Sequence, residues 1–291
     1  MARSCAWDLG VGNALELGIW SLGFDAKIQT LTSLILARPL VYAHRGGAAL
    51  RPENTLAAFD HGLTLGADGL ELDVHLSRDG VVVVHHDDTL DRTTNATGPI
   101  STWSAADLAG VDAGYRFALT ADVFPYRGQG WGVPTLRQVL VRYPVPLIIE
   151  LKTPDPALAQ ATVEEIRAAR AVERVAVGSF SYRALREIRR LEPRLATGAA
   201  REETRWALYR SWVRWPVRDT AYREFQVPER SGLTTIVTPR FIEMAHGAGL
   251  PVKVWTVNER ADIDRLLGWG VDAIISDRPD IAVSAVRTRA R

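Results

Sequence analysis

The sequence predicts an α/β protein folded as a (β/α)8 TIM barrel, and three observations support this prediction. Short β-rich runs alternate with helical stretches from residue 40 onward. Most of these runs are apolar throughout, which is typical of parallel strands covered by helices. The chain has 291 residues, which is enough for a barrel of about 250 residues and an extension. The alternative is an open doubly wound sheet, but no GxGxxG fingerprint follows the first strand.

The predicted strands follow one another at the spacing that strand–helix units require. They are LVYAH (40–44), GLELDVHL (69–76), GVVVVHH (80–86), PLIIEL (146–151), RVAVGSF (174–180), RLATGA (194–199), REFQVP (223–228), VKVWTV (252–257) and VDAIIS (271–276). The second and third runs are joined by the turn Arg78-Asp79-Gly80.

Helical periodicity fills the intervals between these runs. Leu56, Phe59 and Leu63 recur at helical spacing, and Pro52 with Asn54 marks the entrance of that helix. The stretches ALAQATVEEIRAARA and YRALREIRRLE lie between later strands. We therefore count about eight strand–helix units, the number that closes a barrel.

Residues 1–38 precede the first strand and form a separate N-terminal extension, so the barrel domain is 39–291. Charged residues such as Asp8, Glu16 and Asp25 interrupt its apolar stretches. No window there reaches the roughly 18 apolar residues of a membrane-spanning helix. We interpret this segment either as a helical extension or as the result of a start codon assigned too far upstream, and in both cases as carrying no catalytic residues.

An insertion at about 88–133 also breaks the alternation. It is rich in Gly, Thr, Asp and aromatic residues, and it begins just after His86. Long irregular segments in compact domains usually act as lids or binding loops. We expect this one to lie over the barrel mouth, where its aromatic side chains either box a cationic headgroup or form a small core: Tyr115, Phe117, Phe124, Tyr126 and Trp131.

Composition excludes some partners. The 35 basic and 34 acidic residues leave a net charge of +1, so there is no general reason to bind nucleic acid. Cys5 is the only cysteine, so no intrachain disulfide forms, and the chain suits the cytoplasm. The sequence carries no signal for an oligomeric state.

Three carboxylates near strand ends predict a metal site. Glu71 and Asp73 are two residues apart on one strand, so their side chains share a face. Such a pair could instead face solvent or pair with arginines. Glu150, which ends an apolar run, favours the metal site, because clustered carboxylates suit Mg²⁺ or Ca²⁺. No HxH, HExxH or Cys cluster indicates zinc.

Two histidines also fall at strand ends. His44 is followed by Arg45 and two glycines, which indicates an anion site rather than a structural histidine. His85 and His86 are adjacent, so at most one of them faces the site. A proton donor and a proton acceptor beside a cation are what the hydrolysis of an unreactive ester requires.

These motifs carry a resemblance. HRGGAALRPENTLAAF, GADGLELDVHLSRDGVVVVHHDDTLDRTT, PTL, IIELK, VKVWTVN and GVDAIISDRP are similar, in order and spacing, to the glycerophosphodiester phosphodiesterase family. The similarity covers about residues 40–283, and the family fold is a TIM barrel. One small departure is Ser276, where threonine is common.

The resemblance implies roles for eight residues. It implies catalytic histidines, metal-binding acids, basic residues that contact phosphate, and an aromatic residue lining the site: His44 and His86; Glu71, Asp73 and Glu150; Arg45 and Lys152; and Trp255. The implied reaction is the metal-dependent cleavage of a small-molecule glycerophosphodiester to glycerol 3-phosphate and an alcohol. Alternatives are a lysophospholipid or sphingomyelin headgroup phosphodiesterase on the same barrel, and an inactive barrel that acts as a binding module.

The segment RWALYRSWVRW raises a separate question about membranes. As a helix it places several aromatic residues on one broad face: Trp206, Leu208, Tyr209, Trp212, Val213 and Trp215. Such a helix could rest on an anionic membrane surface. We favour the simpler interpretation, a helix packed on the sheet after the fifth barrel strand.

Overall fold

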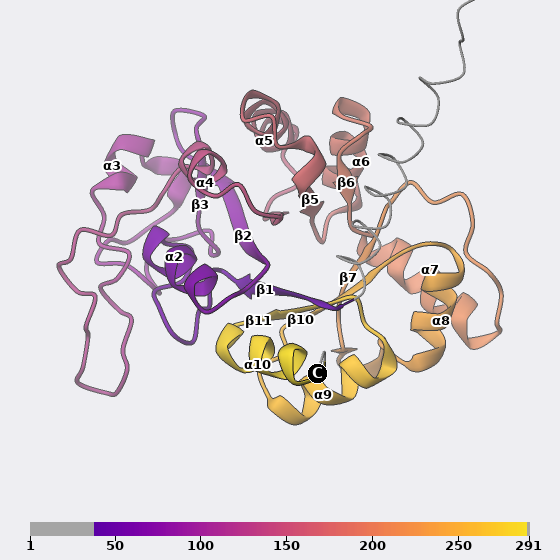
Figure 1. Cartoon of the computed structure of the whole chain (residues 1–291). Coiled ribbons are helices and arrows are strands. Elements are labelled where there is room, and N and C mark those ends of the chain that lie inside the picture. Colours follow the sequence, from indigo (N-terminus) through magenta and orange to yellow (C-terminus); the bar gives the residue numbers. More distant parts are fainter. Residues whose placement is uncertain (1–37, 290–291) are drawn as a thin grey trace, which may run out of the picture. The chain divides into compact units, whose positions relative to one another are not determined.

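Eight parallel strands form the centre of the fold in this computed structural model, which describes residues 38–289 (Figure 1). The strands are β1 (Leu40–His44), β2 (Gly69–Leu76), β4 (Leu147–Leu151), β5 (Val175–Gly178), β6 (Ala196–Thr197), β7 (Phe225–Pro228), β10 (Val252–Trp255) and β11 (Ala273–Ser276). β1 pairs with both β2 and β11, so the first and last strands are neighbours. Most of the predicted extension, residues 1–37, lies outside the described residues.

The sheet curls until its two end strands meet. β6 and β7 are joined just beside their ends by a parallel bridge between Gly198 and Glu224. The Ala199 N–H donates to the Glu224 carbonyl (3.0 Å), and the Arg223 N–H donates to the Thr197 carbonyl (2.9 Å). This seam closes the sheet, and the predicted TIM barrel is confirmed.

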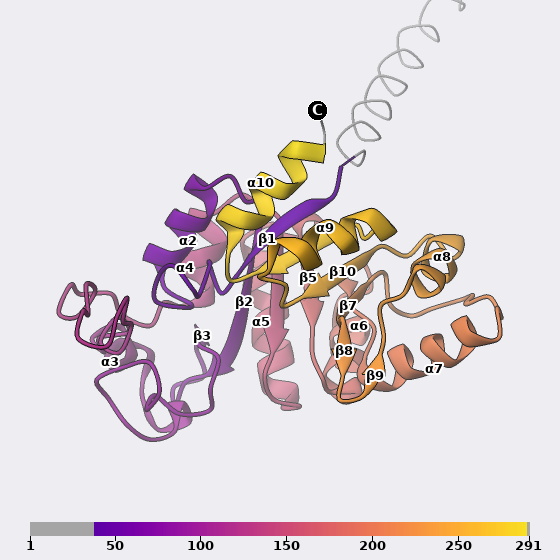
Figure 2. The same ribbon diagram turned by 90° about the horizontal axis from the view of Figure 1, so that it is seen from below.

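Helices cover the outside of the barrel (Figures 1 and 2). The longer ones are α2 (Leu56–Thr64), α4 (Leu136–Arg142), α5 (Pro156–Ala168), α6 (Tyr182–Leu191), α7 (Arg201–Trp212), α8 (Pro239–Gly247), α9 (Arg260–Trp269) and α10 (Pro279–Arg289). Helix starts follow local sequence: the Thr55 hydroxyl accepts a hydrogen bond from the Ala58 N–H, and Pro156 and Pro239 begin α5 and α8. One apolar core between sheet and helices joins these elements.

Strand β3 (Val82–Val84) pairs antiparallel with the far end of β2, outside the barrel. This pairing extends β2 to Leu76. Glu71 and Asp73 therefore lie within β2 and not at its end, which corrects the sequence prediction. They are still level with the carboxyl ends of the neighbouring strands, because β1 ends at His44, the register partner of Glu71.

The insertion folds around a small core of its own. The insertion contains a 3-10 turn, η1 (Ile100–Thr102), and the short helix α3 (Ala105–Ala109). Outside the insertion, a second 3-10 turn, η2 (Val172–Arg174), precedes β5. The core consists of aliphatic residues, with Trp103 packed against them: Val83, Leu90, Ile100, Leu108, Val111, Ala113 and Val133. The five aromatic residues, for which such a core was one of two alternatives, are absent from this cluster.

Helix α7 packs on the barrel after the fifth parallel strand, as expected. Its inward stripe includes Ala207 and Leu208, whereas Trp206 and Trp212 point to solvent. The expected aromatic face is therefore divided between core and surface. A hairpin that the sequence did not predict, β8 (Arg230–Ser231) and β9 (Thr234–Thr235), lies beside α7 (Figure 2). None of the helices within residues 38–289 has the length and apolarity needed to span a bilayer.

Candidate functional site

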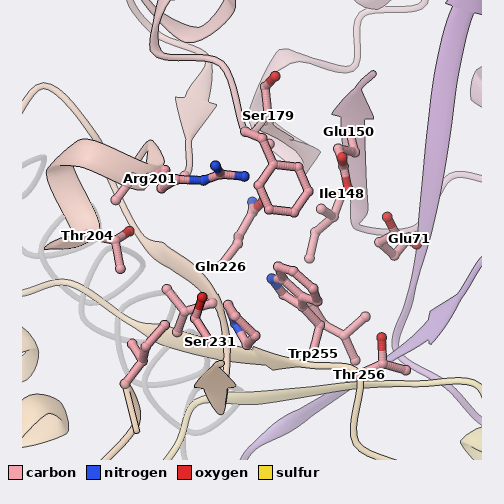
Figure 3. A pocket seen from close by; sticks show the side chains of 18 of the residues that line it. Glu71, Ile148, Glu150, Ser179, Arg201, Thr204, Gln226, Ser231, Trp255 and Thr256 are labelled. Carbon is pink, nitrogen blue, oxygen red and sulfur yellow. The ribbon is translucent and has the colours of Figure 1, made fainter. Parts of the chain in front are cut away.

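The predicted site residues come together around one pocket of about 710 Å³ at the carboxyl ends of the barrel strands (Figure 3). Seven of the eight line its wall: His44, Arg45, Glu71, His86, Glu150, Lys152 and Trp255. The eighth, Asp73, is 1% exposed and lies beneath the wall. From there its carboxylate pairs with both Arg45 and Lys152.

Strand register explains why residues distant in sequence meet here. His44 on β1 is the register partner of Glu71 on β2, and Asp73 on β2 is the partner of Glu150 on β4. Glu71 and Asp73 point to the same side of their strand. One oxygen from each of the three acids lies within 4.8 Å of the others. A single divalent cation can bridge carboxylates at this spacing.

Burial and repulsion make the acidic cluster unfavourable without a cation. Burial, and then the charge of Asp73, raises the pKa of Glu71 to about 8. Burial also favours protonation of Asp73, but Lys152 and Arg45 outweigh it and hold the pKa of Asp73 below its usual value. Asp73 Oδ1 lies 3.2 Å from Lys152 Nζ. This set of hard oxygen donors fits Mg²⁺ or Ca²⁺.

His44 is oriented by residues near the other end of the chain. Its Nδ1 lies 2.6 Å from Oδ1 of Asp277, which directly follows β11. Asn258 holds this carboxylate by donating from Nδ2 to Asp277 Oδ2 (2.9 Å). Burial lowers the pKa of His44, but Glu71 and Asp277 outweigh burial and leave the pKa raised. With Nδ1 engaged, Nε2 is the ring nitrogen that can exchange a proton with a ligand.

The two adjacent histidines point in different directions. His86 lines the pocket, and its Nδ1 lies 2.6 Å from Asp87 Oδ1. Arg92 donates two hydrogen bonds to the Asp87 carboxylate (2.7 and 3.0 Å), so the partner of His86 is itself fixed. His85 is buried away from the pocket, where its ring nitrogens lie 3.0 Å from the Asp87 carbonyl and 3.1 Å from the Thr93 hydroxyl.

Two cationic side chains stand beside the acids. Lys152 Nζ donates to Glu150 (3.1 Å) and lies 3.2 Å from Asp73. Arg45 donates to Glu53 (3.0 Å), and its Nε lies 3.2 Å from Asp73. Burial acts to lower the pKa of both bases, but the neighbouring carboxylates outweigh it and raise both values. Arg45 and Lys152 are therefore charged groups facing a pocket, which suits a phosphate ligand.

A tight turn after β1 brings α2 against the site. Gly46 has φ +86°, and a Cβ there would lie 2.7 Å from Ala58. The residue before it, Arg45, also has a positive φ of 51°. The turn places Asn54 beside β2, where its Nδ2 donates to Asp73 Oδ2 (2.9 Å). Glycine is required at position 46 because only it combines this backbone with this approach.

The pocket continues beyond the acids toward α7 and the β8–β9 hairpin. Phe180 and Trp255 meet edge to face with ring centroids 5.7 Å apart. The Arg201 guanidinium lies 5.3 Å from the Phe180 ring centroid. Figure 3 shows Arg201 and Thr204 on the opposite side of the pocket from Glu71. Apart from Trp255, sequence reasoning missed the pocket-lining role of Phe180, Arg201 and Thr204, because these residues belong to no recognisable motif.

The insertion stands apart from the pocket. None of residues 88–133 lines the pocket wall. Arg92 links the insertion to the site, because it pairs with Glu53 and Asp87 at the edge. Of the two alternatives for its aromatic residues, the box is therefore not supported at this pocket. Instead, the Arg127 guanidinium lies 4.2 Å from the ring centroid of Tyr115 and 3.8 Å from that of Phe124.

Sequence reasoning also missed the carboxylates that hold the two histidines. Asp277 directly follows the apolar run VDAIIS, so its position at a strand end was a usable signal. Asp87 stands next to His86 in HHDD, and its role depends on the rotamers that the fold selects. Asn258 ends the quoted motif VKVWTVN, but its contact with Asp277 depends on the packing of β10 beside β11.

Comparison of the sequence with known proteins points to the same family as the motifs do. The model of the "Glycerophosphoryl diester phosphodiesterase family" matches residues 44–281. A glycerophosphodiester phosphodiesterase of Caldanaerobacter subterraneus is 33% identical over 256 residues, covering 86% of this chain and 98% of the relative. One from Bacillus subtilis is 30% identical over 294 residues, covering 92% of this chain and 95% of the relative.

Solved structures give the same result. A glycerophosphodiester phosphodiesterase from Agrobacterium tumefaciens matches with a TM-score of 0.67 and 29% identity, covering 84% of this chain and 99% of that one. A phosphodiesterase from Oleispira antarctica, in complex with the product sn-glycerol-3-phosphate, matches with a TM-score of 0.68 and 27% identity. That match covers 86% of this chain and 97% of the other.

Proposed function

The chain belongs to the glycerophosphoryl diester phosphodiesterase family, and on this premise we propose how its pocket hydrolyses glycerophosphodiesters. The reaction releases glycerol 3-phosphate and a free alcohol. The Oleispira relative was solved with that product bound. The matched segment contains all eight residues that the sequence singled out, and we assign the catalytic unit to residues 39–291.

Glu71, Asp73 and Glu150 hold a hard divalent cation in this proposal, either Mg²⁺ or Ca²⁺. The buried, mutually repelling carboxylates support this assignment. When bound, such a cation polarises the phosphoryl oxygens and offsets charge on the phosphate. Arg45 and Lys152 bind the phosphate oxygens, because both present charged groups at the pocket wall.

His44 and His86 move the protons. Each has its Nδ1 against a carboxylate at 2.6 Å, which leaves Nε2 to act on the substrate. In a two-step route, the glycerol 2-hydroxyl attacks phosphorus and loses its proton to one histidine. The other histidine protonates the departing alcohol, leaving a cyclic phosphate. Water then opens the cyclic phosphate with the two roles reversed, because the second step retraces the first.

The observation that carries the proposal is the convergence of three acids, two cations and two carboxylate-held histidines on one pocket. The test is hydrolysis by the purified full-length chain of glycerophosphocholine, glycerophosphoethanolamine and glycerophosphoglycerol. We expect glycerol 3-phosphate from at least one substrate, loss of activity with EDTA, and recovery with added Mg²⁺ or Ca²⁺. Activity that survives EDTA would refute the metal assignment. We place the reaction in the cytoplasm, since Cys5 is the only cysteine.

A further inference from the structure

Helix α7 exposes a row of aromatic rings beside the pocket. Trp206 is 68% exposed and Trp212 is 53% exposed. The Trp206 and Tyr209 ring centroids are 6.1 Å apart, and those of Tyr209 and Trp212 are 5.2 Å apart. The row continues past the helix with Val213 and Trp215, which are 71% and 65% exposed. Water-facing aromatic groups of this size mark an interaction site.

The β8–β9 hairpin adds a second element to the same rim. Its tip residue, Leu233, is 97% exposed. Its flanking residues Ser231 and Thr234 line the pocket together with Tyr209 and Trp212 of α7. Figure 2 shows the hairpin and α7 side by side. We define the α7 surface as the exposed apolar residues of this rim: Trp206, Tyr209, Trp212, Val213, Trp215 and Leu233.

The charge around this surface is positive. Segment 201–218 contains five arginines and two glutamates, a formal charge of +3. One of the two acids, Glu203, is already paired with Arg189 of α6 at 2.8 Å. Tryptophan and tyrosine at a water–lipid boundary, with arginines beside them, are typical of proteins that rest on anionic membranes.

The pocket links the α7 surface to the acidic cluster. Its wall carries polar side chains such as Arg201, Thr204 and Gln226, and among them apolar ones along which a chain can lie: Ile148, Phe180, Leu208, Val227 and Ile236. A volume of about 710 Å³ is in the range that holds drug-sized ligands. Glycerol phosphate and a small headgroup need less space, and a charged diester gains nothing from an apolar wall. An acyl chain would gain from burial along it.

We propose that the α7 surface docks on an anionic phospholipid membrane, from which the pocket takes a single-chain glycerophospholipid. The phosphodiester lies at the acidic cluster, and the acyl chain runs along the apolar wall toward α7. The substrate half of this proposal rests on the proposed function, whereas the docking half does not.

The test compares the full-length chain with a variant of the α7 surface. The variant Trp206→Ser/Val213→Ser/Trp215→Ser changes exposed residues that do not line the pocket. The matched control, Leu119→Ser/Val141→Ser, removes apolar residues of similar exposure, 60% and 74%, from other parts of the barrel domain. Circular dichroism checks that all proteins fold.

Vesicle sedimentation measures docking. Wild type and control should pellet with vesicles of phosphatidylcholine mixed with phosphatidylserine, more than with phosphatidylcholine alone. The triple variant should bind the mixed vesicles at least about tenfold more weakly. Equal binding by wild type and triple variant, or no binding by the wild type, would overturn the proposal. So would a wild-type dimer that the triple variant converts to a monomer, because the surface would then serve a second copy.

Kinetics test the substrate. On lysophosphatidylcholine embedded in mixed vesicles, kcat/KM of the triple variant should fall by about tenfold, in step with membrane partitioning. On water-soluble glycerophosphocholine it should stay within about twofold of wild type. Equal losses on both substrates would overturn the proposal. The sedimentation arm contains no catalytic step, so it decides the docking surface even if the enzyme hydrolyses neither substrate.

Discussion

Replacing Asp277 with asparagine tests the arrangement around His44 most directly. The Asn258 amide orientation is fixed, because its Oδ1 accepts hydrogen bonds from the Asp277 N–H and the Ser276 hydroxyl. Asn258 Nδ2 must therefore donate to residue 277. In Asp277→Asn, the new amide oxygen has to face Asn258, which turns the new NH₂ group toward His44 Nδ1. His44 would then carry its proton on Nε2 and could not accept one there.

The size of the loss follows from the bond removed. A charge-assisted hydrogen bond, here at 2.6 Å, contributes about 1.5–3 kcal/mol, or roughly ten- to 150-fold in rate. The wrong tautomer adds to this, so we expect kcat to fall by about 10²–10⁴-fold. Burial lowers the pKa of His44, while Glu71 and Asp277 raise it. Without the Asp277 charge, the pKa of His44 falls, and the limb of the pH–rate profile that reports His44 moves to lower pH.

The assay is kcat and kcat/KM on glycerophosphocholine across pH, with the cation in excess, for wild type and Asp277→Asn. The matched control is Asp280→Asn, which removes the same charge three residues later but from a carboxylate bonded to Arg278. The control should retain the wild-type profile. An Asp277→Asn enzyme within about threefold of the wild-type kcat, with neither limb of the pH–rate profile moved, would refute the assigned role of Asp277.

Three other predictions test the metal, the histidines and the backbone. Glu150→Gln should weaken Mg²⁺ or Ca²⁺ binding at least about tenfold by calorimetry, since a charged ligand is lost; unchanged affinity would contradict the site. His86→Ala should lower kcat about a hundredfold or more, whereas His85→Ala should mainly cost about 1–3 kcal/mol of unfolding free energy; the reverse ranking would mean that the histidine roles are exchanged. Gly46→Ala should cost about 2 kcal/mol or more in urea unfolding, because its φ is +86° and a Cβ would meet Ala58 at 2.7 Å; wild-type stability would contradict the turn geometry.

The barrel could be predicted because its signals are local. Apolar strands and amphipathic helices differ in period, and that period is determined by a few neighbouring side chains. Polar residues at the ends of apolar runs, such as His44 and Glu150, identified the acids and histidines in the same way. In a parallel barrel all carboxyl strand ends face one side, so local position was enough to predict a shared site.

The long-range contacts could not be predicted in this way. Asp277 meets His44 across 233 positions only because β11 closes on β1. The insertion 88–133 was expected over the mouth, but its aliphatic residues form a core beside the barrel and leave the pocket rim to α7 and the hairpin. The period of the apolar residues shows that a segment has an apolar face and a polar face. It does not show which neighbouring element covers each face.

Sequence alone determined the strand–helix order, the candidate site residues and the family, since these depend on short-range pattern and residue type. Tertiary structure decided which carboxylate holds each histidine, where the insertion packs, and which side of α7 meets water. The physical reason is that a helix buries whichever stripe its neighbours can pack against. On α7 that stripe was Ala207 and Leu208, and the larger tryptophans remained exposed.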